Sequence, residues 1–190
     1  MVPDTSLRLS AVVKALQDII TPALPAEARF AHEQLELIKK SIQIAIDQIP
    51  HEHAFAVRDA QDYMALAKRL IDYVEPETQP RERLASLIAR GDSIVPTCIP
   101  DRPEFEVFLR QLKREIEAVV EMLCGQPAGS AQRDVQMLVL DHCARQTLRE
   151  RAWTIATGFE SDPNAVPPVA ALIYGEVTSG MVESGVVGSV

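Results

Sequence analysis

The chain has 190 residues, of which 47% are hydrophobic and 24% are charged, and its formal net charge is -8 at pH 7. A chain of this length and composition is expected to form one domain with a hydrophobic core rather than a disordered segment. The negative charge disfavours nucleic acid and anionic membrane surfaces as partners, because phosphate groups would be repelled and the basic residues are interleaved with carboxylates.

The cysteines Cys98, Cys124 and Cys143 are odd in number and show no Cys-x-x-Cys spacing. This pattern predicts reduced thiols rather than a disulfide framework or a zinc site. The first nine residues lack a basic region followed by an apolar run, and no segment approaches the roughly 20 apolar residues of a membrane-spanning helix. We therefore expect a cytoplasmic protein without a membrane partner.

A first helix is expected to begin near Asp4 and to end at Pro22, since apolar residues recur at helical spacing between them. A second helix is expected to run to Ile49 with Pro25 as its first residue, where the missing N–H costs little. The predicted core positions of this second helix are three and four residues apart: Leu35, Ile38, Ile42, Ala45 and Ile49.

The second helix carries three further apolar residues, Leu37, Ile44 and Ile46, outside those core positions. Its apolar surface is therefore wider than one partner helix would cover. We predict that these three residues form an interaction surface, which a second copy of the chain would bury in a homodimer.

A third helix is expected between Pro50 and Val74, and it would form an antiparallel hairpin with the second helix. A short helix is expected from Arg81 to Ala89, with Gly91 as its C-cap. Residues 91–103 contain three prolines without a period, which indicates a linker between two halves of one bundle.

A strong helix is expected from Phe105 to Cys124, and another from about Ala131 to Thr157, ended by Gly158. The inner side of the latter helix is predicted to consist of Met137, Leu140, Ala144, Leu148 and Ile155. Residues 159–190 are expected to form a C-terminal extension in which only Pro168–Tyr174 makes a docked helical turn, and the chain end is expected to be mobile.

The candidate metal ligands are His32, Glu36, His51 and His53, because imidazole and carboxylate groups bind metals. His32 and Glu36 are four residues apart and share one helix face, whereas His51 and His53 could share a metal only if Pro50 keeps their segment non-helical. Di-iron bundles use Glu-x-x-His repeats, and the sequence contains none. The alternative interpretation of His51 and His53 is an exposed helix start, and no cofactor is predicted.

Asp141, His142 and Cys143 place an acid, a base and a nucleophile in succession. Consecutive helical residues point about 100° apart, so these three side chains cannot form a catalytic relay. The sequence also lacks a Gly-x-Gly-x-x-Gly fingerprint, a phosphate-binding loop, a Gly-x-Ser-x-Gly elbow and a His-Glu-x-x-His motif. No catalytic residue is predicted.

Pro22-Ala23-Leu24, followed by Arg29-Phe30 and the long apolar helix to Ile49, resembles the start of a family of uncharacterised helical bacterial proteins. Members are often encoded beside aminoglycoside-phosphotransferase-like kinases and acyl-CoA dehydrogenases. The resemblance covers about the first quarter of the chain, and Pro25-Ala26 stands where the family often has a glycine. It implies a genomic neighbourhood rather than a mechanism.

These patterns together predict an all-α fold, an up-down helical bundle of five or six helices. The bundle would be a single domain over residues 1–158, followed by the extension. We expect a non-catalytic interaction or accessory protein that acts as a homodimer. A further protein partner is compatible with this prediction. The alternative is a small-molecule or metal-binding bundle with its site between helices.

Overall fold

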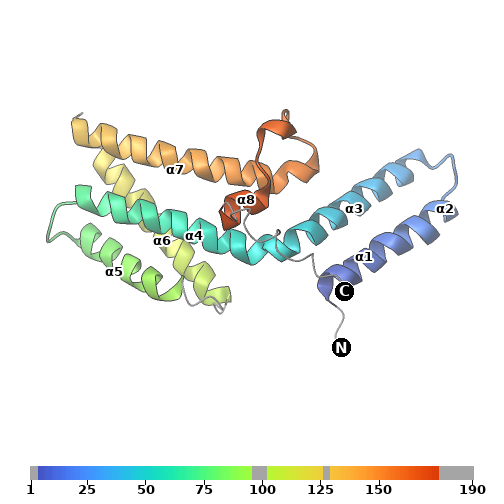
Figure 1. Cartoon of the computed structure of the whole chain (residues 1–190), viewed down its shortest axis with the longest axis horizontal. Coiled ribbons are helices and arrows are strands. Elements are labelled where there is room, and N and C mark those ends of the chain that lie inside the picture. The colour runs from blue at the N-terminus through green and yellow to red at the C-terminus, as the bar shows by residue number, and fades with distance from the viewer. Residues whose placement is uncertain (1–3, 96–101, 126–128, 176–190) are drawn as a thin grey trace, which may run out of the picture. The chain divides into compact units, whose positions relative to one another are not determined.

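The computed structural model describes residues 4–95, 102–125 and 129–175 of the chain (Figure 1). Every regular element in these ranges is a helix, and no strand occurs in them. The expected all-α fold is confirmed.

The chain divides into two compact units, which are described separately below. The first unit joins residues 1–54 with residues 149–190, and the second unit comprises residues 55–148. The expectation of a single domain over residues 1–158 stays a prediction.

The first unit begins with a helical hairpin in which α1 and α3 lie side by side (Figure 1). Its elements are α1 (Thr5–Ala15), the π turn η1 (Leu16–Ile20), α2 (Thr21–Ala23) and α3 (Arg29–Gln48). We call residues 5–48 the N-terminal hairpin.

The first helical stretch runs past Pro22, so the expectation that this proline ends it is wrong. The wider π turn η1 precedes Pro22, and Thr21 Oγ1, directly after this turn, donates a hydrogen bond to the carbonyl of Leu16 at 2.9 Å. A wider turn accommodates the proline ring, which would clash with the carbonyl four residues earlier in a regular α-helix. The stretch ends instead at Leu24, whose extended backbone (φ -77°, ψ 135°) is the conformation that a following proline favours.

The second helix begins at Arg29, four residues after its expected start at Pro25. Pro25 and Ala28 belong to a separate turn, in which the Ala28 N–H donates to the Pro25 carbonyl at 3.0 Å. This turn reverses the chain between α2 and α3.

No chain reversal occurs at Pro50. The 3-10 turn η2 (Ile49–His51) continues directly from α3 into α4 (Glu52–Leu70), and Gln48 and Glu52 both have right-handed helical backbone angles. Pro50 is compatible with this path because it lies at the start of the turn, where its missing N–H costs little. The predicted hairpin of the second and third helices is therefore wrong, and α3 pairs with α1.

The rest of the first unit follows the end of α7 (Ser130–Thr154) and consists of η4 (Ile155–Thr157), η5 (Pro163–Ala165) and α8 (Val169–Tyr174). Gly158 adopts the left-handed conformation (φ 83°) directly after η4, so the predicted stop is confirmed. The predicted docked turn is also confirmed, since it forms α8 and its Ile173 is buried. The prediction of a mobile chain end concerns residues 176–190, which lie outside the described ranges.

The second unit packs α4, α5 (Gln79–Ile94), α6 (Arg102–Cys124) and α7 around one apolar core. On α6 the core residues are three or four positions apart, as one buried helix face requires. The largest members of the core across the four helices are Met64, Leu66, Leu70, Leu84, Phe105, Phe108, Leu112, Ile116, Leu123 and Leu138.

Gly91 does not end a helix, contrary to the prediction, since α5 continues to Ile94. The position is buried, and a Cβ atom there would lie 2.6 Å from Cε of Met64 and 2.7 Å from Cζ of Phe108. Gly91 therefore lets α5 approach the core side chains of α4 and α6 closely. The predicted linker is partly helical, and its residues 96–101 lie outside the described ranges.

The buried face of α7 also differs from the prediction. Val135, Leu138 and His142 are buried, whereas the predicted inner residues Met137, Leu140 and Ala144 are exposed and Leu148 and Ile155 are half-buried. Apolar residues occur on two faces of α7, so spacing alone does not identify the buried face. The histidine at a core position further obscured it.

Candidate interaction surface

The N-terminal hairpin buries few of its apolar side chains. Helix α1 has no buried residue, and in α3 only Leu35 is buried. Large apolar side chains stay exposed on both sides of the turn: Leu7, Val12, Ile19, Ile20, Phe30, Leu37 and Ile38. The pairing of α1 with α3 therefore covers only part of their apolar surface.

The exposed apolar residues of the first helical stretch lie to one side of its contact with α3. Leu9, Val13 and Leu16 are half-buried at helical spacing and mark the contact line. With 3.6 residues per turn, Val12 and Ile19 lie about 90° from this line.

The contact line of α3 is marked by buried Leu35 and half-buried Ile42. Ile38 lies about 60° from Leu35 on this line, whereas Phe30 and Leu37 lie about 140° and 160° from it, on the side of α3 that faces away from α1. Because α1 and α3 are antiparallel, Val12, Ile19 and Ile38 lie on one side of the pair, and Phe30 and Leu37 lie on the adjoining outer side of α3. We call the surface of Val12, Ile19, Phe30, Leu37 and Ile38 the hairpin face.

The three predicted interaction residues differ in exposure. Leu37 is 57% exposed, whereas Ile44 and Ile46 are half-buried. Ile46 lies close to the line along which α3 faces α1. Ile38 was predicted as a core residue, and its exposure of 49% shows that this assignment is wrong.

Ile44 is flanked by two hydrogen bonds within the first unit. Lys40 Nζ donates to the carbonyl of Thr157 at 3.0 Å, and Gln48 Nε2 donates to the carbonyl of Trp153 at 3.0 Å. Lys40 and Gln48 are four residues before and after Ile44, so the end of α7 and the following turn η4 lie across this end of α3. Phe30, which the sequence pattern did not single out, is seven residues before Leu37, and this repeat was the signal that could have identified it.

The hairpin is nearly neutral within an acidic chain. The first 48 residues contain five basic and six acidic residues, a net charge of -1. Since the whole chain carries -8, the remaining residues carry -7. The exposed apolar surface therefore lies where charge repulsion between two copies is weakest.

The candidate metal ligands of α3 have other partners. His32 Nε2 lies 3.2 Å from the carbonyl oxygen of Pro25, the residue that begins the preceding turn. Glu36 forms an exposed ion pair with Lys39 at 2.6 Å. The i, i+4 spacing of His32 and Glu36 thus serves two separate local contacts.

His51 Nδ1 lies 3.1 Å from the hydroxyl oxygen of Tyr174 on α8, while His53 is exposed. Pro50 does not keep this segment non-helical, because η2 and α4 are continuous. In residues 4–95, 102–125 and 129–175, no three His, Cys, Asp or Glu side chains gather closely enough to hold a metal ion.

A polar cluster, which the sequence did not reveal, lies between α4, α6 and α7 in the second unit. Lys113 Nζ is 2.7 Å from Asp59 Oδ2 and 4.5 Å from the centre of the Tyr63 ring. The Tyr63 hydroxyl donates to Gln146 Oε1 at 3.1 Å, and its ring meets that of His142 with centroids 4.5 Å apart. The i, i+4 pairs on α4 and α7 were the available signal.

Burial raises the pKa of Tyr63 above its ordinary value of 10.0, although the Lys113 ammonium and the hydrogen bond to Gln146 act in the opposite direction. Asp59 and His142 are also buried. Polar groups that bond to one another across three helices fix the relative register of those helices. We therefore interpret the cluster as structural.

Asp141, His142 and Cys143 point in different directions, as expected. Asp141 pairs with Arg145 at the surface, Cys143 is exposed, and His142 is 3% exposed against Tyr63. The three groups do not form a relay.

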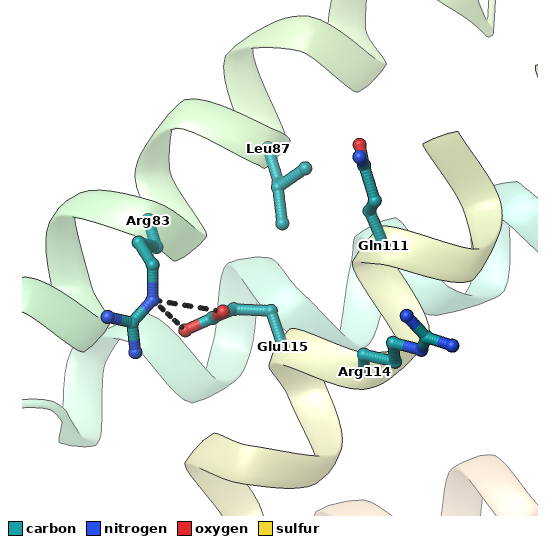
Figure 2. A pocket seen from close by; sticks show the side chains of 5 residues that line it. All are labelled: Arg83, Leu87, Gln111, Arg114 and Glu115. Atoms are coloured by element: carbon teal, nitrogen blue, oxygen red, sulfur yellow. Dashed lines mark hydrogen bonds and ion pairs between the residues drawn. The ribbon is translucent and has the colours of Figure 1, made fainter. Parts of the chain in front are cut away.

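An open depression of about 360 Å³ lies between α5 and α6 and is lined by Arg83, Leu87, Gln111, Arg114 and Glu115 (Figure 2). Arg83 Nε donates to both carboxylate oxygens of Glu115, at 2.9 and 3.1 Å. Figure 2 shows that the guanidinium groups of Arg83 and Arg114 point away from each other. A specific small-molecule site needs polar groups that converge on the ligand, and these do not.

Among the described residues, no helix combines the length and the apolar character needed to cross a membrane. The resemblance of the N-terminal quarter to a bacterial family stays a prediction. No protein-family model, no curated protein and no solved structure matches this chain.

Proposed function

We propose that the protein is a non-catalytic interaction protein that acts as a homodimer through the hairpin face. The observation that carries the proposal is the exposure of five large apolar side chains on two adjoining sides of a hairpin whose helices α1 and α3 bury only Leu35. Contiguous exposed apolar surface is typical of interaction sites. A hairpin with an uncovered apolar side is completed when further helices pack against that side.

A second copy of the chain is the partner that suits this face best. Two hairpins related by a twofold axis would bury the same residues on both sides, as an isologous interface does. Residues 49–190 carry -7 per copy and would repel, whereas residues 1–48, which contain the hairpin, carry only -1. Two copies therefore approach most easily through their hairpins.

The test is the substitution Leu37→Glu, followed by sedimentation velocity at micromolar concentration. The wild-type chain is expected to associate through the hairpin face. The variant should weaken this contact at least tenfold, because burial of a leucine side chain contributes about 1.5–3 kcal/mol and about 1.4 kcal/mol corresponds to a factor of ten. Leu37 is exposed in one copy, so the variant should keep its helix content.

The matched control is Gln17→Glu, which adds the same charge on the opposite side of the first helical stretch. Gln17 is exposed, and the control should leave the dimer unchanged. A strictly monomeric wild-type chain would contradict the proposal, as would equal weakening by both variants.

A cytoplasmic location belongs to the same proposal. It is supported by the cysteines, whose number and spacing suit reduced thiols. Cys124 and Cys143 are both free in the structure.

The metal-binding alternative has no geometric support in the described residues. Elemental analysis of the purified protein tests it directly. Stoichiometric metal that is lost when His51 and His53 are both replaced by alanine would restore this alternative.

A further inference from the structure

Helix α7 has a second apolar face within the second unit. Its buried face consists of Val135, Leu138 and His142, which join the core or the polar cluster. A separate stripe of Met137, Leu140 and Ala144 follows the spacing i, i+3, i+7, which places the three residues on one side of the helix.

The outer stripe of α7 is strongly exposed. Met137 is 64% and Leu140 61% exposed, the highest values for large apolar side chains in the described part of the second unit. Both values exceed that of Leu37 on the hairpin face. Two such side chains one turn apart, with a small alanine beside them, leave an apolar surface that a partner helix could approach closely.

The charges along α7 suit self-association. Residues 130–148 contain two basic and two acidic residues and are therefore neutral, although the whole chain carries -8. Asp141 and Arg145 form an ion pair beside the stripe, and both side chains are about half exposed. An acid and a base placed four residues apart on one face are self-complementary when two such helices meet antiparallel.

We infer that the outer stripe of α7 is a second self-association surface, occupied by α7 of another copy in antiparallel orientation. With the twofold axis near residues 142 and 143, Leu140 of each copy lies close to Ala144 of the other, and Met137 lies close to Leu148. The same axis places Asp141 opposite Arg145 of the other copy. The ion pairs then link the two copies on both sides of the axis.

This surface is independent of the hairpin face, because it lies in the other unit. A chain with two self-complementary surfaces forms assemblies larger than a dimer when each surface has its own twofold axis. The wild-type chain is therefore expected to sediment as a species larger than a dimer. Disruption of either surface alone should leave a dimer, and disruption of both should leave a monomer.

The experiment compares Leu140→Glu, Leu37→Glu and the double variant by sedimentation velocity, with Gln61→Glu as the control. Gln61 is an exposed residue of α4 in the same unit, so this control should keep the wild-type mass. Circular dichroism should show unchanged helix content in every variant, because all the replaced side chains are exposed.

The outcomes separate the two proposals. A Leu37→Glu variant that is already monomeric overturns the α7 surface while leaving the hairpin dimer intact. A dimer that Leu140→Glu dissociates and Leu37→Glu does not affect supports the α7 surface and removes the hairpin dimer.

A charge exchange tests the antiparallel pairing. Arg145→Asp places two acids opposite two acids and should weaken the α7 contact at least tenfold. The double variant with Asp141→Arg and Arg145→Asp restores complementary pairs and should recover the association. If neither the single nor the double variant changes the strength of association, the antiparallel arrangement is overturned.

Discussion

The N-terminal hairpin and the four helices of the second unit share the same apolar spacing but bury it to different extents. In the second unit, Leu70, Leu84, Phe108 and Leu112 have no exposed surface, while α1 of the hairpin has no buried residue at all. The helices of the second unit share one apolar core, although α7 also carries an exposed outer stripe, whereas each hairpin helix has one main neighbour. The two regions differ in how much of their apolar surface neighbouring helices bury, rather than in amino-acid composition.

Polar contacts take a larger part in the first unit. Lys40 and Gln48 donate to backbone carbonyls of η4 and of the end of α7, and His51 contacts Tyr174 of α8. Such contacts in exposed positions contribute little individually. The hairpin unit should therefore be the less stable of the two in an isolated copy, and assembly should stabilise it.

The largest difference in stability between the two regions should appear when one leucine in each region is replaced by alanine. Leu112→Ala removes a fully buried side chain and should lower the free energy of unfolding by about 3 kcal/mol. Leu7→Ala truncates a side chain of α1 that is mostly exposed and should cost less than about 0.5 kcal/mol. Urea denaturation followed by circular dichroism measures both, and comparable losses would refute the contrast.

The next effect concerns the close approach at Gly91. Gly91→Val would bring its side chain against Met64 and Phe108, and overpacking of this kind costs about 1–3 kcal/mol. Ala89→Val is the control, because Ala89 is exposed on the same helix and the new residue has the same helix propensity. Thermal unfolding should show a larger drop in Tm for the Gly91 variant than for the Ala89 variant. Equal drops in Tm would mean that Met64 and Phe108 move aside at no cost in stability.

The positions of the helices could be predicted well from the sequence, but the helices that pack against one another could not. Periodicity correctly located the helix from Phe105 to Cys124, the stop at Gly158 and the turn that forms α8. These features depend on local backbone chemistry and on one apolar face. The hairpin expected at Pro50 failed because a proline in the first turn of a helix and a proline that ends a helix look alike in sequence.

It was harder to predict from the sequence which face of each helix is buried and which is exposed. On α7 the outer stripe was taken for the core because His142 interrupts the true inner stripe. On α3, Leu37 is exposed as an interaction residue should be, while Ile44 is half-buried beside a segment more than 100 residues later in the chain. Such coverage depends on distant residues, which helical spacing does not reveal.

A smaller effect should distinguish the buried polar cluster from the apolar core around it. Tyr63→Phe removes the hydrogen bond to Gln146 and should cost about 1 kcal/mol at neutral pH. The pKa of Tyr63 is raised in the folded state, so its contribution is fully present below pH 10 and is lost as the pH rises through the folded-state pKa. Above pH 10 the wild-type chain should therefore lose stability more steeply than the variant, and parallel pH profiles would contradict this.

The smallest effect belongs to the polar contacts of the first unit. Arg151 donates to both carboxylate oxygens of Glu160, at 2.8 and 2.9 Å, and together with the Asp162 N–H it lowers the pKa of Glu160 to about 2. Arg151→Gln should raise this pKa towards the ordinary value of 4.5, as an NMR titration of the side-chain carboxyl would show. Arg145→Gln, which breaks an exposed ion pair elsewhere on α7, should not raise it. Because the pKa is lowered in the folded state, the contribution of Glu160 is present above pH 4.5 and is lost as the pH falls towards 2. A wild-type midpoint near 4.5 would show that the segment after Gly158 is not held by this pair.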